Sequence, residues 1–114
     1  MDISVLVPLY NEAESLPVLH DWIVRVMKEH QFSYEILFVN DGSTDDSWAV
    51  IKTLQAKDTN VKGICFRRNY GKSAALHCGF QAVQGDVVIT MDADLQDSPD
   101  EIPELYRMVK QDGY

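Results

Sequence analysis

The sequence is poor in cysteine, in long apolar runs and in basic residues. Its two cysteines, Cys65 and Cys78, form no Cys-x-x-Cys pair, and no signal peptide precedes them, so we expect two small buried thiols in a reducing cytoplasm. The apolar runs are far shorter than the roughly 20 residues of a membrane-spanning helix. With 18 acidic and 10 basic residues the formal net charge is -8, which argues against nucleic acid or an anionic membrane surface as a partner of this segment.

The 114 residues suit one domain in which apolar strands alternate with amphipathic helices. Short apolar runs predict strands at 3–7, 34–39, 61–66 and 86–91. Helix-spaced apolar residues predict helices at about 16–30, around the stripe of Trp48, Ile51 and Leu54, at about 73–84 and from 99 onward. The last of these presents an apolar face that consists of Ile102, Leu105, Tyr106 and Val109.

Polar and glycine residues predict where these helices begin and end. We expect Ser15 to cap the first helix and the hydroxyls of residues 43–44 to cap the second. Gly85 and Gly113 are expected to end the third and the last helix. Ser98 and Glu101 have the spacing of a capping box.

This order predicts an α/β fold with a parallel sheet, right-handed crossovers and helices on both faces, because the strands are too uniformly apolar to have a wet face. In a parallel sheet the residues that follow each strand meet at one edge, where ligands of such folds bind. Four polar segments follow the predicted strands, at 10–12, 40–43, 67–72 and 92–96. The connections at the opposite edge, near 31–33, 57–60 and 84–85, carry no comparable group of residues. We therefore expect a site at the carboxyl edge.

Asp92 and Asp94 are candidate ligands of a divalent cation. If the backbone is still extended there, their spacing of two turns both carboxylates to the same side. Such a pair is a half-site for Mg²⁺ or Mn²⁺, which keep positions open for water or phosphate, and Gln96 could add a neutral oxygen. The alternative is a solvated acidic turn.

The other three segments could bind a nucleotide. Tyr10 can lie against a base or ribose, Glu12 and Asp41 can accept hydrogen bonds, and Lys72 with the arginines before it can reach phosphate. Singly, each residue has another explanation. Tyr10 could be a packing residue, and Glu12 could be an acid in the first turn of a helix, where the helix dipole stabilises it. Asp41 could be an ordinary turn residue and Lys72 an ordinary solvated side chain. Jointly they favour a site. The three histidines stand apart from the acidic residues and are not expected to be ligands.

Four ordered motifs read Val-Pro-Leu-Tyr-Asn-Glu at 7–12, Val-Asn-Asp-Gly-Ser at 39–43, Arg-Asn-Tyr-Gly-Lys at 68–72 and Met-Asp-Ala-Asp-Leu-Gln-Asp at 91–97. Together they resemble glycosyltransferase family 2, whose fold is the Rossmann-like GT-A fold. The last is most similar to the subgroup that transfers a sugar from a nucleotide donor to polyprenyl or dolichyl phosphate. Many members carry Asp where Asn40 stands. Members also continue past this length with an acceptor half, so we expect residues 1–114 to be the donor-binding part of a longer enzyme, truncated on its C-terminal side.

The resemblance implies an inverting, Mg²⁺- or Mn²⁺-dependent transferase that acts on a nucleotide-diphosphate sugar and a lipid-phosphate acceptor. The nucleotide-binding residues that it implies are Pro8, Tyr10, Glu12, Val39, Asp41, Asn69, Lys72, Asp92, Ala93 and Asp94. The implied metal ligands are Asp92, Asp94 and Gln96. No general base is assignable, and an anionic phosphate acceptor would need none. The whole protein is expected in the cytoplasm or on the cytoplasmic face of a membrane.

Two other functions compete with this interpretation. A nucleotidyltransferase would need a glycine-rich loop after the first strand, where Pro8-Leu9-Tyr10 stands instead. A non-catalytic nucleotide-sugar-binding module fits 114 residues without an acceptor half. The sugar and the base, guanosine or uridine, stay open at this point. An uncovered strand edge in so short a sheet would favour pairing with a second copy.

Overall fold

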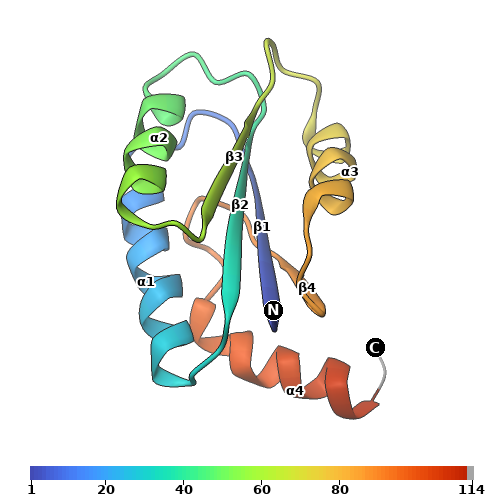
Figure 1. The fold of residues 1–114 in the computed structure, drawn as a ribbon. Helices are drawn as coiled ribbons and strands as arrows, with labels where there is room; N and C mark the ends of the chain where they lie inside the picture. The colour runs from blue at the N-terminus through green and yellow to red at the C-terminus, as the bar shows by residue number, and fades with distance from the viewer. Residues whose placement is uncertain (113–114) are drawn as a thin grey trace.

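The computed structural model describes residues 1–112, in which four parallel strands form one sheet (Figure 1). The strands are β1 (Ile3–Leu9), β2 (Tyr34–Asn40), β3 (Val61–Cys65) and β4 (Val87–Thr90), in the order β3-β2-β1-β4. The predicted parallel α/β fold is therefore confirmed. Because β4 pairs only with the first half of β1, from Ile3 opposite Val87 to Leu6 opposite Thr90, the chain after β4 runs free beside the second half of β1.

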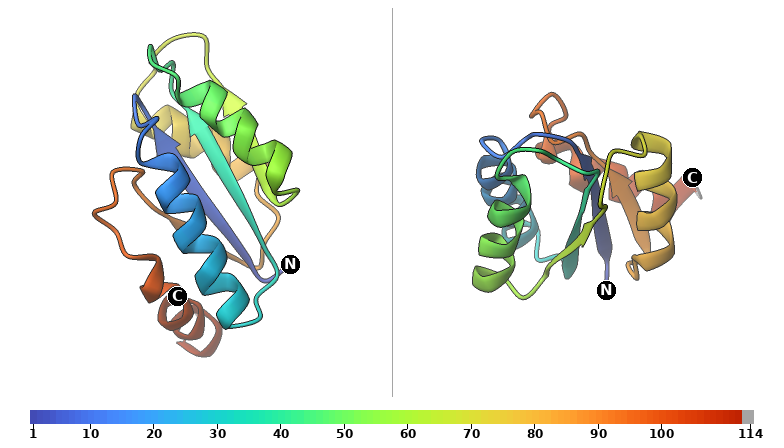
Figure 2. Two further views of the ribbon diagram at one scale, coloured as in Figure 1. Left: turned by 90° about the vertical axis from the view of Figure 1, so that its left-hand side faces the viewer. Right: turned by 90° about the horizontal axis from the view of Figure 1, so that it is seen from above.

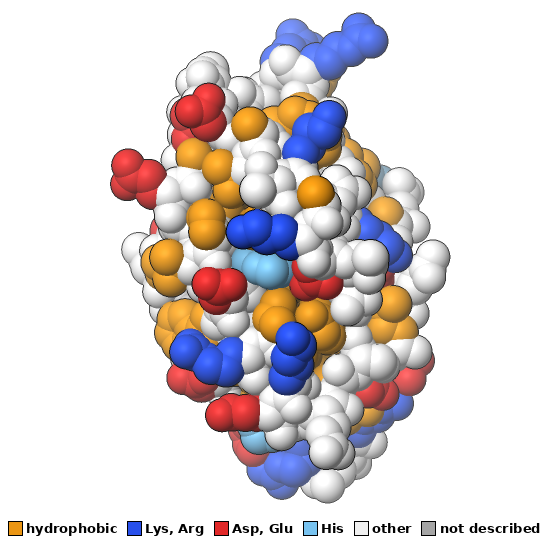
Figure 3. Space-filling model, turned by 60° about the vertical axis from the view of Figure 1, so that its left-hand side comes forward, with side chains coloured by type: hydrophobic (Ala, Val, Ile, Leu, Met, Phe, Trp, Pro, Cys, Tyr) orange, Lys and Arg blue, Asp and Glu red, His pale blue; other side chains and the backbone are white. Residues whose placement is uncertain are grey.

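Helices cover both faces of the sheet, as the apolar strands predict (Figure 2). One face packs against α1 (Leu16–Glu29) and α2 (Ser47–Lys57), and the other packs against α3 (Lys72–Ala82). A short 3-10 turn, η1 (Pro99–Glu101), leads into α4 (Ile102–Asp112), which crosses the amino end of the sheet. The outer surface of α1 and α2 mixes acidic and basic side chains with apolar ones (Figure 3).

Two hydrophobic clusters hold these layers together. The larger one lies between the sheet and α1 and α2, and Ile102 at the start of α4 joins it. The smaller one lies under α3 and consists of Leu6, Leu37, Val39 and Ala75. Gly79 lets α3 come close to β1, because a Cβ atom there would stand 2.3 Å from Cδ1 of Leu6. Within residues 1–112, no helix combines the length and apolar character that crossing a membrane requires.

The predicted helix ends were only partly correct. The Ser15 hydroxyl makes no cap bond, and its single proton is shared between the Glu12 carbonyl at 3.1 Å and the Glu12 carboxylate at 3.0 Å. The predicted hydroxyl cap of α2 is absent too: its N-cap residue, Asp46, makes no side-chain cap bond, and Asp45 Oδ1 accepts from Ser47 N at 2.9 Å in the turn before the helix. Helix α3 ends at Ala82 with Val83 extended, so Gly85 does not terminate it.

Gly85 serves a different purpose, a close approach between backbones. A Cβ atom at Gly85 would lie 2.5 Å from the Ser4 nitrogen. At the start of η1, Ser98 Oγ accepts from Asp100 N at 3.3 Å, while no bond from the Glu101 side chain completes the box in the described residues. Gly113, expected to end the last helix, lies outside the described residues.

Two burial predictions were wrong. Cys65 is exposed because it is the last residue of the edge strand β3, and Cys78, in α3, is only half-buried. Leu105 is 38% exposed, although Ile102 on the same helix is fully buried. Helix α4 packs on the main cluster through Ile102, Tyr106 and Val109, and the ring centroid of Tyr106 lies 4.8 Å from that of Phe32.

Candidate functional site

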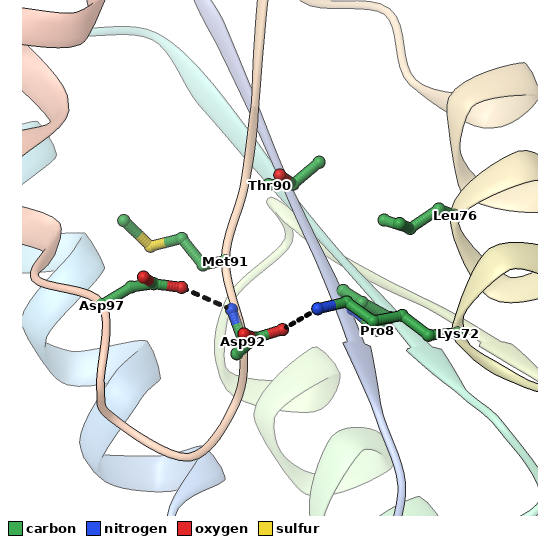
Figure 4. A pocket seen from close by; sticks show the side chains of 7 residues that line it. All are labelled: Pro8, Lys72, Leu76, Thr90, Met91, Asp92 and Asp97. Carbon is green, nitrogen blue, oxygen red and sulfur yellow. Dashed lines mark hydrogen bonds and ion pairs between the residues drawn. The ribbon is translucent and has the colours of Figure 1, made fainter.

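Three hollows open at the carboxyl edge of the sheet, and Pro8 near the end of β1 lines all of them. One, which we call the nucleoside-side hollow after the ligand that the sequence leads us to expect, has a volume of about 260 Å³ and is lined by Leu9, Tyr10, Asp41, Asn69, Gly71 and Lys72. The acidic hollow, of about 140 Å³, is lined by Leu9, Tyr10, Glu12, Asp92, Ala93 and Asp94. The bridging hollow, of about 80 Å³, is lined by Lys72, Leu76, Thr90, Met91, Asp92 and Asp97 (Figure 4). The segments that follow all four strands thus meet around one proline.

The segment after β1 is fastened to the segment after β2. Asn11 has a left-handed backbone with φ of 55°, and its Oδ1 accepts from Thr44 N at 2.8 Å. Its own backbone N–H donates to Ser43 Oγ at 2.9 Å. The Tyr10 ring therefore stands exposed between two tied loops, at the boundary of the nucleoside-side and acidic hollows.

Asp41 fastens the segment after β2 to the segment after β3. Its side chain is buried, and its two carboxylate oxygens accept from Tyr70 N at 2.7 Å and from Gly71 N at 3.0 Å. Gly42, with φ of +74°, leaves room for this loop, because a Cβ atom there would stand 2.1 Å from the Arg68 carbonyl carbon. Asp41 therefore shapes the nucleoside-side hollow as well as lining it.

Lys72 crosses from α3 to the segment after β4. It is the first residue of α3, and its Nζ lies 2.6 Å from Asp92 Oδ1 (Figure 4). The hydrogen bond to Asp92 and the charge of that carboxylate raise the pKa of Lys72, with smaller contributions from Asp97 and Asp94. The lysine is therefore a fixed positive charge among three carboxylates at any physiological pH.

The acidic segment does not continue the strand, contrary to the expectation of an extended backbone. Strand β4 ends at Thr90, and Ala93 and Asp94 form a turn. Asp94 Oδ1 accepts from Gln96 N at 3.2 Å, and Asp97 Oδ2 accepts from Asp92 N at 2.9 Å. The turn nevertheless brings Asp92 and Asp94 to the same acidic hollow.

This hollow suits a divalent cation as a half-site. Among residues 1–112, no three His, Cys, Asp or Glu side chains are grouped so as to hold a metal by themselves. Asp92 and Asp94 offer hard carboxylate oxygens on one exposed surface, which is the donor type that Mg²⁺ and Mn²⁺ take when water or phosphate fills their other positions. Gln96 is exposed on the same loop.

The structure thus brings together most of the predicted site residues. Pro8, Tyr10, Glu12, Asp41, Asn69, Lys72, Asp92, Ala93 and Asp94 line the hollows. Val39 is fully buried in the cluster under α3 and is not among the residues that line the three hollows. Asn11 and Asp97 received no role from the sequence, although they hold the loops in place. Their polar side chains in loop motifs were the only signal for that role.

Comparisons with known proteins add a family and a fold. A sequence model described as glycosyl transferase family 2 matches residues 4–114. The undecaprenyl-phosphate 4-deoxy-4-formamido-L-arabinose transferase of Sodalis glossinidius (strain morsitans) is 44% identical over 111 residues, which are 96% of this chain and 34% of that protein. The protein of the same name from Pseudomonas fluorescens (strain SBW25) is 46% identical over 104 residues, 90% of this chain and 30% of that one. The chain spans about a third of the length of these curated relatives.

Solved structures share the fold at lower identity. A mannosyltransferase from Pyrobaculum calidifontis, in complex with GDP-Man and Mn²⁺, superposes with a TM-score of 0.80 at 22% identity. The match covers 94% of this chain and 32% of that one. A glucosyl-3-phosphoglycerate synthase from Mycobacterium tuberculosis gives a TM-score of 0.74 at 24% identity, over 96% of this chain and 40% of that one.

Proposed function

Because the chain belongs to glycosyltransferase family 2, we propose that it binds a nucleotide-diphosphate sugar in a metal-dependent site and serves in inverting transfer of the sugar to a polyprenyl phosphate. One observation carries this proposal. The nucleoside-side hollow and the acidic hollow adjoin at Pro8 and Tyr10, and Lys72 reaches from the first toward the second. A nucleoside and its diphosphate need such neighbouring surfaces.

The nucleoside would occupy the larger hollow. Tyr10 offers an exposed ring against which a base or ribose can lie, and Asn69 offers an amide that can donate or accept. Asp41 uses one lone pair of each oxygen on the Tyr70 and Gly71 amides, so each oxygen keeps a second one for a donor on the ligand. Glu12 lines the acidic hollow, where its carboxylate already accepts from the Ser15 hydroxyl at 3.0 Å.

The diphosphate would lie at the acidic hollow. Asp92 and Asp94 would hold Mg²⁺ or Mn²⁺ there, with Gln96 as a further oxygen donor from the same loop. The bound cation would offset the charge that develops on the leaving diphosphate. Lys72 adds a positive charge at the same place, so the two carboxylates do not repel the phosphates unopposed.

The acceptor follows from the relatives' names and from the chemistry of the site. Two relatives at 44% and 46% identity are named as undecaprenyl-phosphate transferases. A phosphate oxygen is already anionic and can displace the nucleoside diphosphate at the anomeric carbon without a general base. A lipid acceptor would place the whole protein at the cytoplasmic face of a membrane.

Ligand-dependent stability tests the proposal. We expect UDP or GDP at about 100 times its dissociation constant to stabilise the fold by about 2.7 kcal/mol, and only when Mg²⁺ or Mn²⁺ is present. Asp94→Ala should abolish this gain. Asp86→Ala is the matched control, because it removes the same charge from an exposed carboxylate that pairs with Lys110 near the amino edge. Metal-independent stabilisation, or an equal gain in Asp94→Ala, would contradict the proposal.

A further inference from the structure

We propose that Lys72 holds the place of the divalent cation at Asp92 and moves to the diphosphate when donor and cation bind together. This inference rests on the proposed function and gives one side chain a specific part in it. The bridging hollow in Figure 4 shows the relevant geometry, in which Lys72 points from α3 past Pro8 to the carboxylate of Asp92. Nζ and Oδ1 are 2.6 Å apart, so the ammonium group occupies an oxygen that a cation at this site would need.

The ion pair between Lys72 and Asp92 can be broken at a small cost in free energy. The side chain of Lys72 is 61% exposed and that of Asp92 is 47% exposed, and ion pairs in such water-accessible positions are weak. Asp92 is held independently of the lysine, because its backbone N–H donates to Asp97 Oδ2. Exchange of the partner of Asp92 therefore requires no rearrangement of the acidic loop.

The backbone of Lys72 is fixed while its side chain is free. The preceding residue, Gly71, donates its N–H to Asp41 and has φ of +101°, which fixes where α3 begins. Lys72 lines both the bridging hollow and the nucleoside-side hollow. A change of side-chain rotamer alone is thus enough to carry the ammonium group from Asp92 Oδ1 to a phosphate at the adjoining acidic hollow, which Asp92 also lines.

This arrangement makes the binding of cation and nucleotide cooperative. A cation that arrives alone must displace Lys72 and leaves the ammonium group without an anion. A diphosphate that arrives with the cation gives the displaced lysine a new partner, so each ligand raises the affinity for the other. A lysine that simply supported the acidic loop would produce no such coupling.

Binding of Mn²⁺ measured by electron paramagnetic resonance, without nucleotide, tests the inference directly. Lys72→Met removes the competing charge, and we expect it to tighten Mn²⁺ binding about three- to fivefold, the range set by a weak exposed ion pair. In saturating Mn²⁺ the same variant should bind UDP or GDP at least about tenfold more weakly, because a charge-assisted hydrogen bond to phosphate is lost. The two effects have opposite signs.

Two control variants isolate the role of Lys72. Lys72→Arg keeps the charge and should bind Mn²⁺ as weakly as the natural protein. Lys57→Met removes the same charge from an exposed position in the last turn of α2 and should change Mn²⁺ affinity by less than about twofold. An affinity for Mn²⁺ that is unchanged or weaker in Lys72→Met overturns the inference while leaving the proposed function intact. If the natural protein bound neither Mn²⁺ nor nucleotide, both would fail.

Discussion

Both ends of the sheet carry charged side chains, but at the amino end the carboxylate of Glu35 is closed off from water. Glu35, in β2, is 1% exposed and accepts from Ser4 Oγ at 2.5 Å, Lys62 Nζ at 2.9 Å and Gln84 N at 2.6 Å. Ser4 in turn accepts from Gly85 N at 2.7 Å. This carboxylate has every partner that a buried charge needs.

A second group of this kind is centred on Asp58, in the turn after α2. Asp58 Oδ1 accepts from Asn60 N at 2.9 Å, and Asp58 Oδ2 accepts from the Tyr34 hydroxyl at 3.3 Å and faces His20 Nε2 at 3.0 Å. These contacts join the turn after α2 to α1 and to the start of β2. The amino edge therefore also carries polar groups, which the sequence did not predict and which fasten strands and turns to one another.

The carboxylates of the carboxyl end are different in kind. Asp92 has one exposed lysine as a side-chain partner, and Asp94 accepts from a backbone N–H within its own loop. Both line hollows, whereas Glu35 is enclosed by protein groups. The comparison teaches that the number of charged residues does not distinguish a binding site from a structural network. A binding site is distinguished by carboxylate lone pairs that face solvent and are free to accept from a ligand.

The most direct test of this difference between the two ends is to remove one carboxylate from each. Glu35→Ala leaves Lys62, Ser4 and the Gln84 amide without their acceptor, and we expect it to lower the free energy of unfolding by about 3 kcal/mol. Asp92→Asn removes an exposed pair and should cost less than about 1 kcal/mol. Urea unfolding of both variants beside the natural protein measures the difference. Similar losses at the two ends would refute the distinction.

Substitution of one glycine at each end of the sheet tests the same distinction, with a smaller expected loss of stability. Ala at Gly85 or at Gly42 would bring Cβ against backbone, at 2.5 Å from the Ser4 nitrogen or 2.1 Å from the Arg68 carbonyl carbon. We expect each to cost about 2 kcal/mol of stability. Only Gly42→Ala should also weaken nucleotide binding, because it displaces the loop that lines the nucleoside-side hollow. Calorimetric titration with UDP or GDP in Mn²⁺ checks this, and equal affinity in both variants would contradict it.

The fold was predictable because it depends on local patterns of apolar residues. The runs around Val5, Phe38 and Ile89 are buried strands, and the helix-spaced stripe through Leu19 and Ile23 is buried as expected. Parallel strands then force the loops after them onto one edge, which is why the convergence of Tyr10, Asp41 and Asp94 followed from the order of elements alone.

The closed network around Glu35 was not predictable in the same way. Ser4 stands directly opposite Glu35 in the register of β1 and β2, and Lys62 stands opposite the neighbouring Leu37 in that of β2 and β3. A sequence read for periodicity does not fix that register. The prediction of an extended backbone in the acidic loop was also wrong. Leu95 takes a left-handed backbone there, with φ of +68°, which residues other than glycine rarely adopt and which periodicity does not reveal. Its half-buried side chain packs on the main core and holds that turn.

The smallest expected effect is a pH dependence carried by the amino end. Burial pushes the pKa of Glu35 upward, but hydrogen bonds from Ser4, Lys62 and the Gln84 amide outweigh it, so the pKa lies below its ordinary value of 4.5. A carboxyl whose pKa is lowered by folding stabilises the fold above its unfolded pKa, and that stability is lost as the pH falls through the folded value. The stability difference between the natural protein and Glu35→Gln should therefore shrink between about pH 5 and pH 3. Thermal unfolding at a series of pH values measures it, and a constant difference would show that the Glu35 contacts do not depend on its charge.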